Sequence, residues 1–341
     1  MTEAGRYPQT ILGTCCVPWH VDGTVDEQRF RRSISTLVRL GLRDLYVFGT
    51  AGEGYAVSER QFDEVTRVFV DALEEHELSP MVGIISLSTS TVIERIERCS
   101  QLGVRLFQVS LPSWGALSDH ELRRFFEETC GRFPELQFLH YNLPRAGRVL
   151  TPKEYAELAD RYLNLVATKN AGASPEVAEA LLAEAGALRH FFTELGYAHA
   201  SLHGEPGLLI SIASMHPGIA REFFDAGRAG DVAGLSALAR EVTGVGEELA
   251  AALGSDLIDG AYDKCFSRIH DRQFPLDLLP PYDGATPEQF ERFTKRVADR
   301  YPRWLELMDV CRSCGAPATQ EEAAVGSGRD PVSVRGSSDR Q

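Results

Sequence analysis

Residues 136–172 have the sequence LQFLHYNLPRAGRVLTPKEYAELADRYLNLVATKNAG, two apolar strand-like runs joined by a helix-like segment. The first run ends at Tyr141 and the second at Lys169. Because side chains of a strand alternate between its faces, we expect Leu165, Ala167 and Lys169 to share one face. Burial in that row would lower the pKa of the lysine amine, as a nucleophile toward a carbonyl requires. The alternative is a strand-end lysine that extends to solvent.

Lysine is rare in this chain, which makes Lys169 conspicuous. The other three lysines lie in charged segments with helical character, at Lys153, Lys264 and Lys295. Only Lys169 follows an apolar strand run. The second half of the opening stretch is therefore a candidate for chemistry and not only for structure.

Strand-like runs recur along the chain, separated by amphipathic segments that begin with helix N-cap patterns such as Ser58-x-x-Gln61 and Thr151-Pro-Lys-Glu154. Eight such units in about 220 residues predict a (β/α)8 barrel. A doubly wound sheet would alternate similarly, but no GxGxxG follows the first run. The predicted strands are 10–17, 44–48, 80–85, 105–110, 136–141, 164–169, 189–194 and 207–212.

The strand pattern stops near residue 220. We predict a barrel over 8–230 and a helical extension over 231–312, with helices at 221–252, 255–272 and 287–310. Residues 313–341 are rich in Gly, Ser, Asp and Arg, a composition typical of a disordered tail.

Composition indicates a globular protein that does not bind nucleic acid or membranes. The chain is 43% hydrophobic and 25% charged, with a formal net charge of −14. The N-terminus lacks a signal-peptide pattern and no run reaches the length of a membrane span, so we expect a cytoplasmic protein. The single Cys311-x-x-Cys314 pair and the i, i+4 pair His199 and His203 are weak metal signals, and we predict no metal site.

In a barrel the active site forms where the strands end. The second strand ends in GTAGEG at 49–54, where closely spaced backbone N–H groups and the Thr50 hydroxyl could hold a carboxylate. An ordinary glycine-rich turn is the alternative. Trp114, after the fourth strand, could line a pocket, contact another subunit or pack within the chain.

A lysine, a phenol and an anion-binding turn at three strand ends suit Schiff-base chemistry on a 2-oxo acid. Lys169 would attack the keto carbon, and Tyr141 would transfer protons. The turn at Thr50 and Ala51 would hold the carboxylate.

The motifs GTAGE at 49–53, YNLP at 141–144 and ATKNAG at 167–172, in this order, resemble the dihydrodipicolinate synthase / N-acetylneuraminate lyase family of class I aldolases. The similarity runs from Ile11 to Gly218 and includes GEPGLLIS at 204–211. It implies a (β/α)8 barrel, a homotetramer or dimer, no metal or organic cofactor, and a 2-oxo acid such as pyruvate with an aldehyde-type partner. It also implies catalytic Lys169, Tyr141 and Thr50, with substrate contacts from Thr50, Ala51, Gly49, Arg145, Leu209 and Trp114.

Several positions depart from the synthase branch of this family, including Asn170, where a glutamate is common. Ala51 stands where a second hydroxyl is common, which removes one hydrogen bond of roughly 1 kcal/mol. The synthase branch carries a tyrosine on the loop after the fourth strand. Trp114 is the aromatic residue nearest to that position in this chain, and an indole cannot relay a proton. Arg145 lies on a loop one residue short. We therefore favour a divergent 2-oxo acid aldolase or dehydratase over 4-hydroxy-tetrahydrodipicolinate synthase itself.

Two other classes of function stay open. The barrel could have lost catalysis and act as a binding or regulatory protein, although it retains Lys169, Tyr141 and Thr50. A metal-dependent aldolase would need convergent His, Asp and Glu ligands, which the sequence pattern does not indicate.

Overall fold

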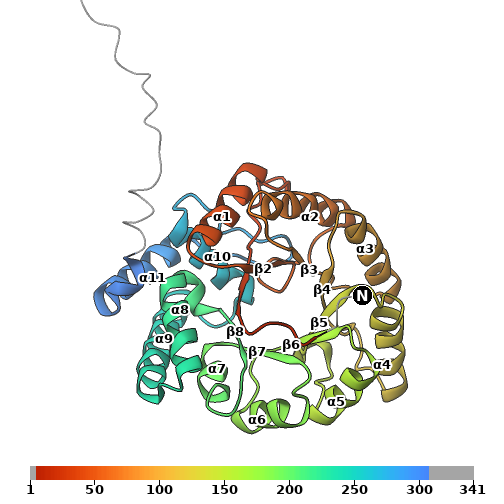
Figure 1. Cartoon of the computed structure of the whole chain (residues 1–341). Coiled ribbons are helices and arrows are strands. Elements are labelled where there is room, and N and C mark those ends of the chain that lie inside the picture. The colour runs from red at the N-terminus through yellow and green to blue at the C-terminus, as the bar shows by residue number, and fades with distance from the viewer. Residues whose placement is uncertain (1–4, 307–341) are drawn as a thin grey trace, which may run out of the picture.

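The computed structural model describes residues 5–306, in which parallel strands close into a barrel ringed by helices (Figure 1). Each strand pairs with the next along the chain, and the last pairs with the first. The predicted (β/α)8 barrel is confirmed. Its strands are β1 (Ile11–Thr14), β2 (Asp44–Val47), β3 (Met81–Gly83), β4 (Leu106–Val109), β5 (Gln137–Tyr141), β6 (Leu165–Asn170), β7 (Arg189–Phe192) and β8 (Gly207–Leu209).

Most of the strands are shorter than the apolar runs that predicted them. The run expected over 10–17 forms a strand only at Ile11–Thr14, yet Cys15, Cys16 and Val17 remain buried beyond its end. Apolar composition marks burial, and these loops are buried as deeply as the sheet. The runs therefore located the strands but, except for β5 at Tyr141, not their carboxyl ends.

The helices around the barrel begin where the N-cap patterns predict. Ser58 and Thr151 each form a capping box with the residue three positions on, Gln61 and Glu154. The helices are α1 (Glu27–Arg39), α2 (Glu59–Glu74), α3 (Thr89–Gln101), α4 (Asp119–Phe126) with a π-helical turn η1 (Glu127–Gly131), a short 3-10 turn η2 (Pro144–Ala146), α5 (Pro152–Arg161), α6 (Pro175–Glu184), α7 (Glu194–Ala200), a second 3-10 turn η3 (Ile212–Met215) and α8 (Pro217–Ala229).

The helices after the barrel are α9 (Val232–Leu253), α10 (Asp259–His270), α11 (Pro287–Arg300) and the turn η4 (Pro302–Leu305). They lie with α8 on one side of the barrel (Figure 1). The predicted helix over 221–252 is wrong as a single element, because Gly230 takes a left-handed φ of 66° and ends α8. The division at residues 230 and 231 stays a prediction. The tail over 313–341, the last residues of the predicted 287–310 helix and both members of the Cys311 and Cys314 pair lie outside the described residues.

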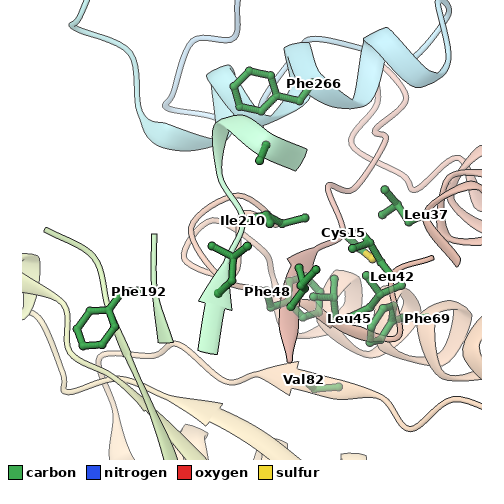
Figure 2. Packing of buried hydrophobic residues seen from close by; sticks show 14 of the residues in the cluster. Cys15, Leu37, Leu42, Leu45, Phe48, Phe69, Val82, Phe192, Ile210 and Phe266 are labelled. Atoms are coloured by element: carbon green, nitrogen blue, oxygen red, sulfur yellow. The ribbon is translucent and has the colours of Figure 1, made fainter. Parts of the chain in front are cut away.

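Apolar side chains form one layer inside the ring of strands and a second layer outside it. The inner layer fills the barrel with one or two side chains from each strand: Leu12, Tyr46, Met81, Leu106, Leu139, Val166, Ala167, Phe191 and Leu209. The outer layer packs the strands against the helices, and Figure 2 shows part of it, including Leu45, Phe48 and Phe69. Among the described residues no helix is long and apolar enough to cross a membrane.

The expectation that Leu165 shares a face with Lys169 is wrong. The register between β5 and β6 shifts between Phe138 and Leu139, which pair with Leu165 and Ala167 and leave Val166 as an extra residue. A bulge of one residue exchanges the faces of a strand. Leu165 therefore belongs to the outer layer, whereas Ala167 stays in the inner layer below Lys169.

Candidate active site

A pocket of about 100 Å³ lies at the carboxyl ends of the strands. Five residues expected at the site line it, namely Lys169, Tyr141, Thr50, Ala51 and Leu209. They come from β6, β5, the turn after β2, and β8. The barrel therefore brings together groups that lie up to about 160 residues apart in the chain, because parallel strands end at one rim.

Lys169 lines this pocket and is buried, with 4% of its surface exposed. Its Nζ donates a hydrogen bond of 2.8 Å to the Tyr46 hydroxyl and lies 4.0 Å from the ring centroid of Tyr141. Burial lowers the pKa of the amine to about 7, while Asp263 and Asp259 act in the opposite direction. A substantial fraction of the amine is thus unprotonated near neutral pH, as nucleophilic attack requires.

Two phenols flank this amine. Tyr141 pairs with Lys169 in the sheet, which fixes their side chains on neighbouring strands at the same height. Burial raises the pKa of Tyr141, and the Thr50 hydroxyl partly offsets the rise. Burial also raises the pKa of Tyr46 well above its ordinary value. Both phenols therefore stay protonated at neutral pH and can donate hydrogen bonds to a substrate oxygen.

Tyr46 was missed by the sequence interpretation although it makes the hydrogen bond to Lys169. The available signal was the alternation of β2, in which residues 44 and 46 share a face. The turn after β2 is built around this ring: a Cβ at Gly49 would lie 2.6 Å from Tyr46 Cε2. Gly49 does not line the pocket, so its contribution is room for the tyrosine.

The same turn carries Glu53, a fully buried residue with a left-handed φ of 58°. Its Oε1 pairs with Lys264 Nζ at 2.7 Å and accepts a hydrogen bond of 2.8 Å from Trp19 Nε1. Its Oε2 accepts a hydrogen bond of 2.6 Å from the backbone N–H of Leu279. This ion pair ties the turn that lines the pocket to α10.

Helix α10 contributes two carboxyl groups to the pocket, Asp259 and Asp263. They lie one helical turn apart, at i and i+4, and so point from the same face. Neither was anticipated, because nothing in the sequence pairs α10 with the strand ends. The spacing DGAYD at 259–263 was the only available signal.

Besides Gly49, two expected substrate contacts are not in the pocket. Arg145 forms a salt bridge of 2.9 Å with Asp259, and both side chains are about half exposed. Trp114 is 90% exposed, so it neither lines the pocket nor packs within the described part of the chain. Neither residue is among those that line the pocket.

The ends of β5 and β6 are held by side-chain amides. Asn142 accepts a hydrogen bond from the Leu150 N–H at 2.9 Å and donates to the Leu150 carbonyl at 3.1 Å. It also donates to Asn170 Oδ1 at 3.2 Å, and Asn170 donates to the Thr168 hydroxyl at 2.7 Å. These buried bonds fix the backbone on both sides of Lys169.

One cluster of possible metal ligands lies among the described residues, formed by Glu179, His199 and His203. Glu179 contacts His199 at 2.8 Å and His203 at 3.4 Å. The cluster lies on α6, α7 and the turn after α7. It shares no residue with the pocket.

Comparison with known proteins finds one family over most of the chain. A model of the dihydrodipicolinate synthetase family matches residues 7–260. A 4-hydroxy-tetrahydrodipicolinate synthase of Thermus thermophilus is 26% identical over 285 residues, covering 82% of this chain and 92% of the relative. The putative 2-dehydro-3-deoxy-D-gluconate aldolase YagE of Escherichia coli is 25% identical over 237 residues, covering 66% of this chain and 78% of the relative.

Solved structures show the same fold. The crystal structure of YagE from Escherichia coli in complex with pyruvate superposes with a TM-score of 0.77 and 18% sequence identity. The match covers 85% of this chain and 98% of that chain. At this identity the structural likeness establishes the architecture alone.

Proposed function

This chain belongs to the dihydrodipicolinate synthetase family, and we propose that it is a lyase that forms a Schiff base between Lys169 and a 2-oxo acid such as pyruvate. The reaction would form or break a carbon–carbon bond between the 2-oxo acid and an aldehyde-type partner, or would dehydrate a 2-oxo acid. The enzymes among its relatives support catalysis as such, since they are synthases and aldolases.

The observation that carries the proposal is the environment of Lys169. A buried amine that lines a pocket, with its pKa lowered to about 7 by burial, is suited to attack a carbonyl carbon. An amine that served only to stabilise the fold would pair with a carboxylate, and among residues 5–306 Lys169 has no such salt bridge.

The residues around Lys169 support roles for two more groups. Tyr141, next to the amine and protonated at neutral pH, would transfer a proton to the oxygen of the carbinolamine. The hydroxyl of Thr50 and the backbone of Ala51 would hold the substrate carboxylate. Tyr46, which accepts the hydrogen bond from Nζ, would orient the amine toward the keto carbon.

The alternative, 4-hydroxy-tetrahydrodipicolinate synthase itself, is less well supported by the residues present. The resemblance would assign Arg145 to a second substrate carboxylate, but its guanidinium is already paired with Asp259. Trp114 is exposed, and Ala51 has no hydroxyl. The Asp259 and Asp263 carboxyl groups also make the pocket unfavourable for a partner that carries an additional negative charge.

Borohydride reduction in the presence of pyruvate tests the proposal. A Schiff base on Lys169 is reduced to a stable secondary amine, which intact-mass measurement and peptide mapping detect. We expect an adduct on Lys169 in the native chain and none in Lys169→Met. The control Lys295→Met, on the exposed face of α11, should form the adduct like the native chain.

Other outcomes would favour the other classes of function. Failure of pyruvate and a panel of longer 2-oxo acids to form any adduct would contradict the Schiff-base proposal. Binding of a 2-oxo acid without an adduct would favour the binding or regulatory protein. Turnover that is lost with EDTA would favour a metal-dependent aldolase.

The homo-oligomer implied by the family resemblance also stays a prediction. The exposed Trp114 on the loop after β4 is available for a contact between copies of the chain. Light scattering coupled to size-exclusion chromatography would measure the mass in solution. A monomer at micromolar concentration would contradict the expectation.

A further inference from the structure

The Asp263 carboxyl group lines the same pocket as Lys169 but has no hydrogen-bond or ion-pair partner among residues 5–306. Other acidic side chains around the pocket do have partners: Glu53 pairs with Lys264, Asp259 with Arg145, and Glu194 with the backbone N–H groups of Ser211 and Ala213. An unpaired carboxylate in a confined pocket costs free energy. An unpaired carboxylate of this kind is expected in an active site, where a positive charge that forms during the reaction can pair with it.

The position of Asp263 is firmly held. Its chain neighbour Lys264 is fully buried and pairs with Glu53 at 2.7 Å, so the helix cannot move away from the turn after β2. One turn earlier, Gly260 packs so closely on that turn that an added Cβ would lie 3.3 Å from the Thr50 carbonyl oxygen. The helix therefore fixes the carboxyl group opposite the strand ends.

The pocket has hydrogen-bond donors but needs a proton acceptor. Burial raises the pKa values of Tyr46 and Tyr141, which makes both phenols poor bases at neutral pH. Burial and the neighbouring Asp259 raise the pKa of Asp263 to about 7, while Lys169 opposes the rise. A carboxyl group in this range both accepts and donates protons near neutral pH.

We propose that Asp263 is a further catalytic residue, which carries the proton between the Lys169 amine and the carbinolamine and then neutralises the resulting iminium cation. The inference rests on the proposed Schiff-base function and adds a role for α10 that the strand-end motifs do not contain. In this proposal the partner that the Asp263 carboxylate lacks is the iminium cation, which forms during the reaction.

The proton and charge balance closes without another reagent. The Asp263 carboxylate takes a proton from the Lys169 ammonium, and the freed amine forms a C–N bond to the keto carbon. Tyr141 relays a proton from the nitrogen to the alkoxide, which gives a neutral carbinolamine. The Asp263 carboxyl group then returns its proton to the departing hydroxyl, the C–O bond breaks, and water leaves. An iminium cation and the Asp263 carboxylate remain in the same pocket.

Asp263→Asn tests the role because it keeps the shape and removes the proton carrier. We expect the rate of pyruvate-dependent, borohydride-trapped adduct on Lys169 to fall about 100-fold. The native rate should show a bell-shaped pH dependence centred near 7, since the pair must hold one proton between them. In Asp263→Asn the profile should become a single rise with pH, with a lower midpoint, because the carboxylate that raises the pKa of Lys169 is gone.

Two further variants separate catalysis from structure. Asp263→Glu should restore the bell-shaped profile and bring the rate to within about tenfold of native. Asp256→Asn, in the exposed segment before α10, should leave the rate and profile unchanged. Thermal unfolding of each variant reports whether the fold is retained.

The outcomes distinguish this inference from the proposed function. Native protein that forms no adduct with any 2-oxo acid would refute the Schiff-base function and this role together. Native protein that forms the adduct, with Asp263→Asn trapping at the native rate and with the native profile, would overturn the role of Asp263 alone. If Asp263→Asn does not fold, Asp263→Glu with a single rising profile would overturn it equally.

Discussion

The chain buries two lysines within the same part of the molecule and surrounds them differently. Lys264 on α10 is fully buried and pairs with Glu53 at 2.7 Å. Lys169 on β6 is nearly as buried, but within residues 5–306 its Nζ contacts the hydroxyl of Tyr46 and the faces of two tyrosine rings and forms no ion pair. The first environment satisfies the ammonium, whereas the second lowers the pKa of the amine to about 7.

The comparison shows that burial alone does not make a lysine reactive. At Lys264 a carboxylate within contact distance compensates the buried ammonium as an ion pair. Lys169 has no carboxylate in an ion pair among residues 5–306, and burial lowers the pKa of its amine. The same substitution at the two sites should therefore affect different properties.

Lys169→Met should have the largest effect, on activity. Adduct formation and turnover should fall by at least about 10³-fold, because the nucleophile is removed. The free energy of unfolding should rise by roughly 1–2 kcal/mol, since an unpaired buried amine is replaced by an apolar side chain. Urea unfolding and borohydride trapping measure the two effects, and a loss of stability would contradict the contrast between the lysines.

Lys264→Met should show the opposite pattern. Removing one partner leaves Glu53 buried and uncompensated, which should lower the free energy of unfolding by about 3–5 kcal/mol. Adding Glu53→Gln should recover part of that loss, because the double variant no longer buries a lone charge. Strict additivity of the two changes in urea unfolding would show that the ion pair does not act as a unit.

Gly49→Ala should disturb Lys169 indirectly. The added Cβ would lie 2.6 Å from Tyr46 Cε2, so the ring that accepts the hydrogen bond from Nζ must move. We expect a loss of activity of about 10²-fold, the cost of a displacement near 1 Å at a catalytic group. Gly115→Ala is the matched control, because nothing lies within 4 Å of its added Cβ; equal activity losses would argue against the role of Tyr46.

The pH dependence of stability should give the smallest effect. The unfolded Lys169 binds a proton below about pH 10.5, whereas the folded residue releases it near pH 7. Between these values the unfolded state holds more protons, so stability rises with pH. From pH 7 to pH 9 the free energy of unfolding of the native chain should rise by roughly 2 kcal/mol relative to that of Lys169→Met. A constant difference would mean that the pKa of Lys169 is not lowered.

The sequence was sufficient to predict the barrel and to predict that Lys169, Tyr141 and Thr50, at strand ends, lie near one another in one pocket. Parallel strands must end at one rim, so the positions of their last residues follow from topology once the alternation is recognised. The face of Leu165 did not follow, since a single extra residue at Val166 reverses the alternation.

The contribution of α10 could not be predicted in the same way. Asp259, Asp263 and Lys264 reach the site through packing between segments more than 200 residues apart, and no local periodicity encodes that contact. Lys264 stands in a charged, helix-like segment, where a lysine is ordinarily exposed. The burial of its partner Glu53 could not be predicted either, because the glycine-rich turn that contains Glu53 was interpreted only as a binding site for a carboxylate.

The ion pair between Glu53 and Lys264 also limits how this protein can be divided or recombined. A chain that stopped at Gly230 would retain every motif that identifies the family's chemistry, yet Glu53 would lose its cation and the pocket would lose its wall of carboxyl groups. A chimera that took its last helices from a relative would need a matching lysine at position 264. The appended helices and the turn after β2 therefore depend on each other structurally and would have to be exchanged together.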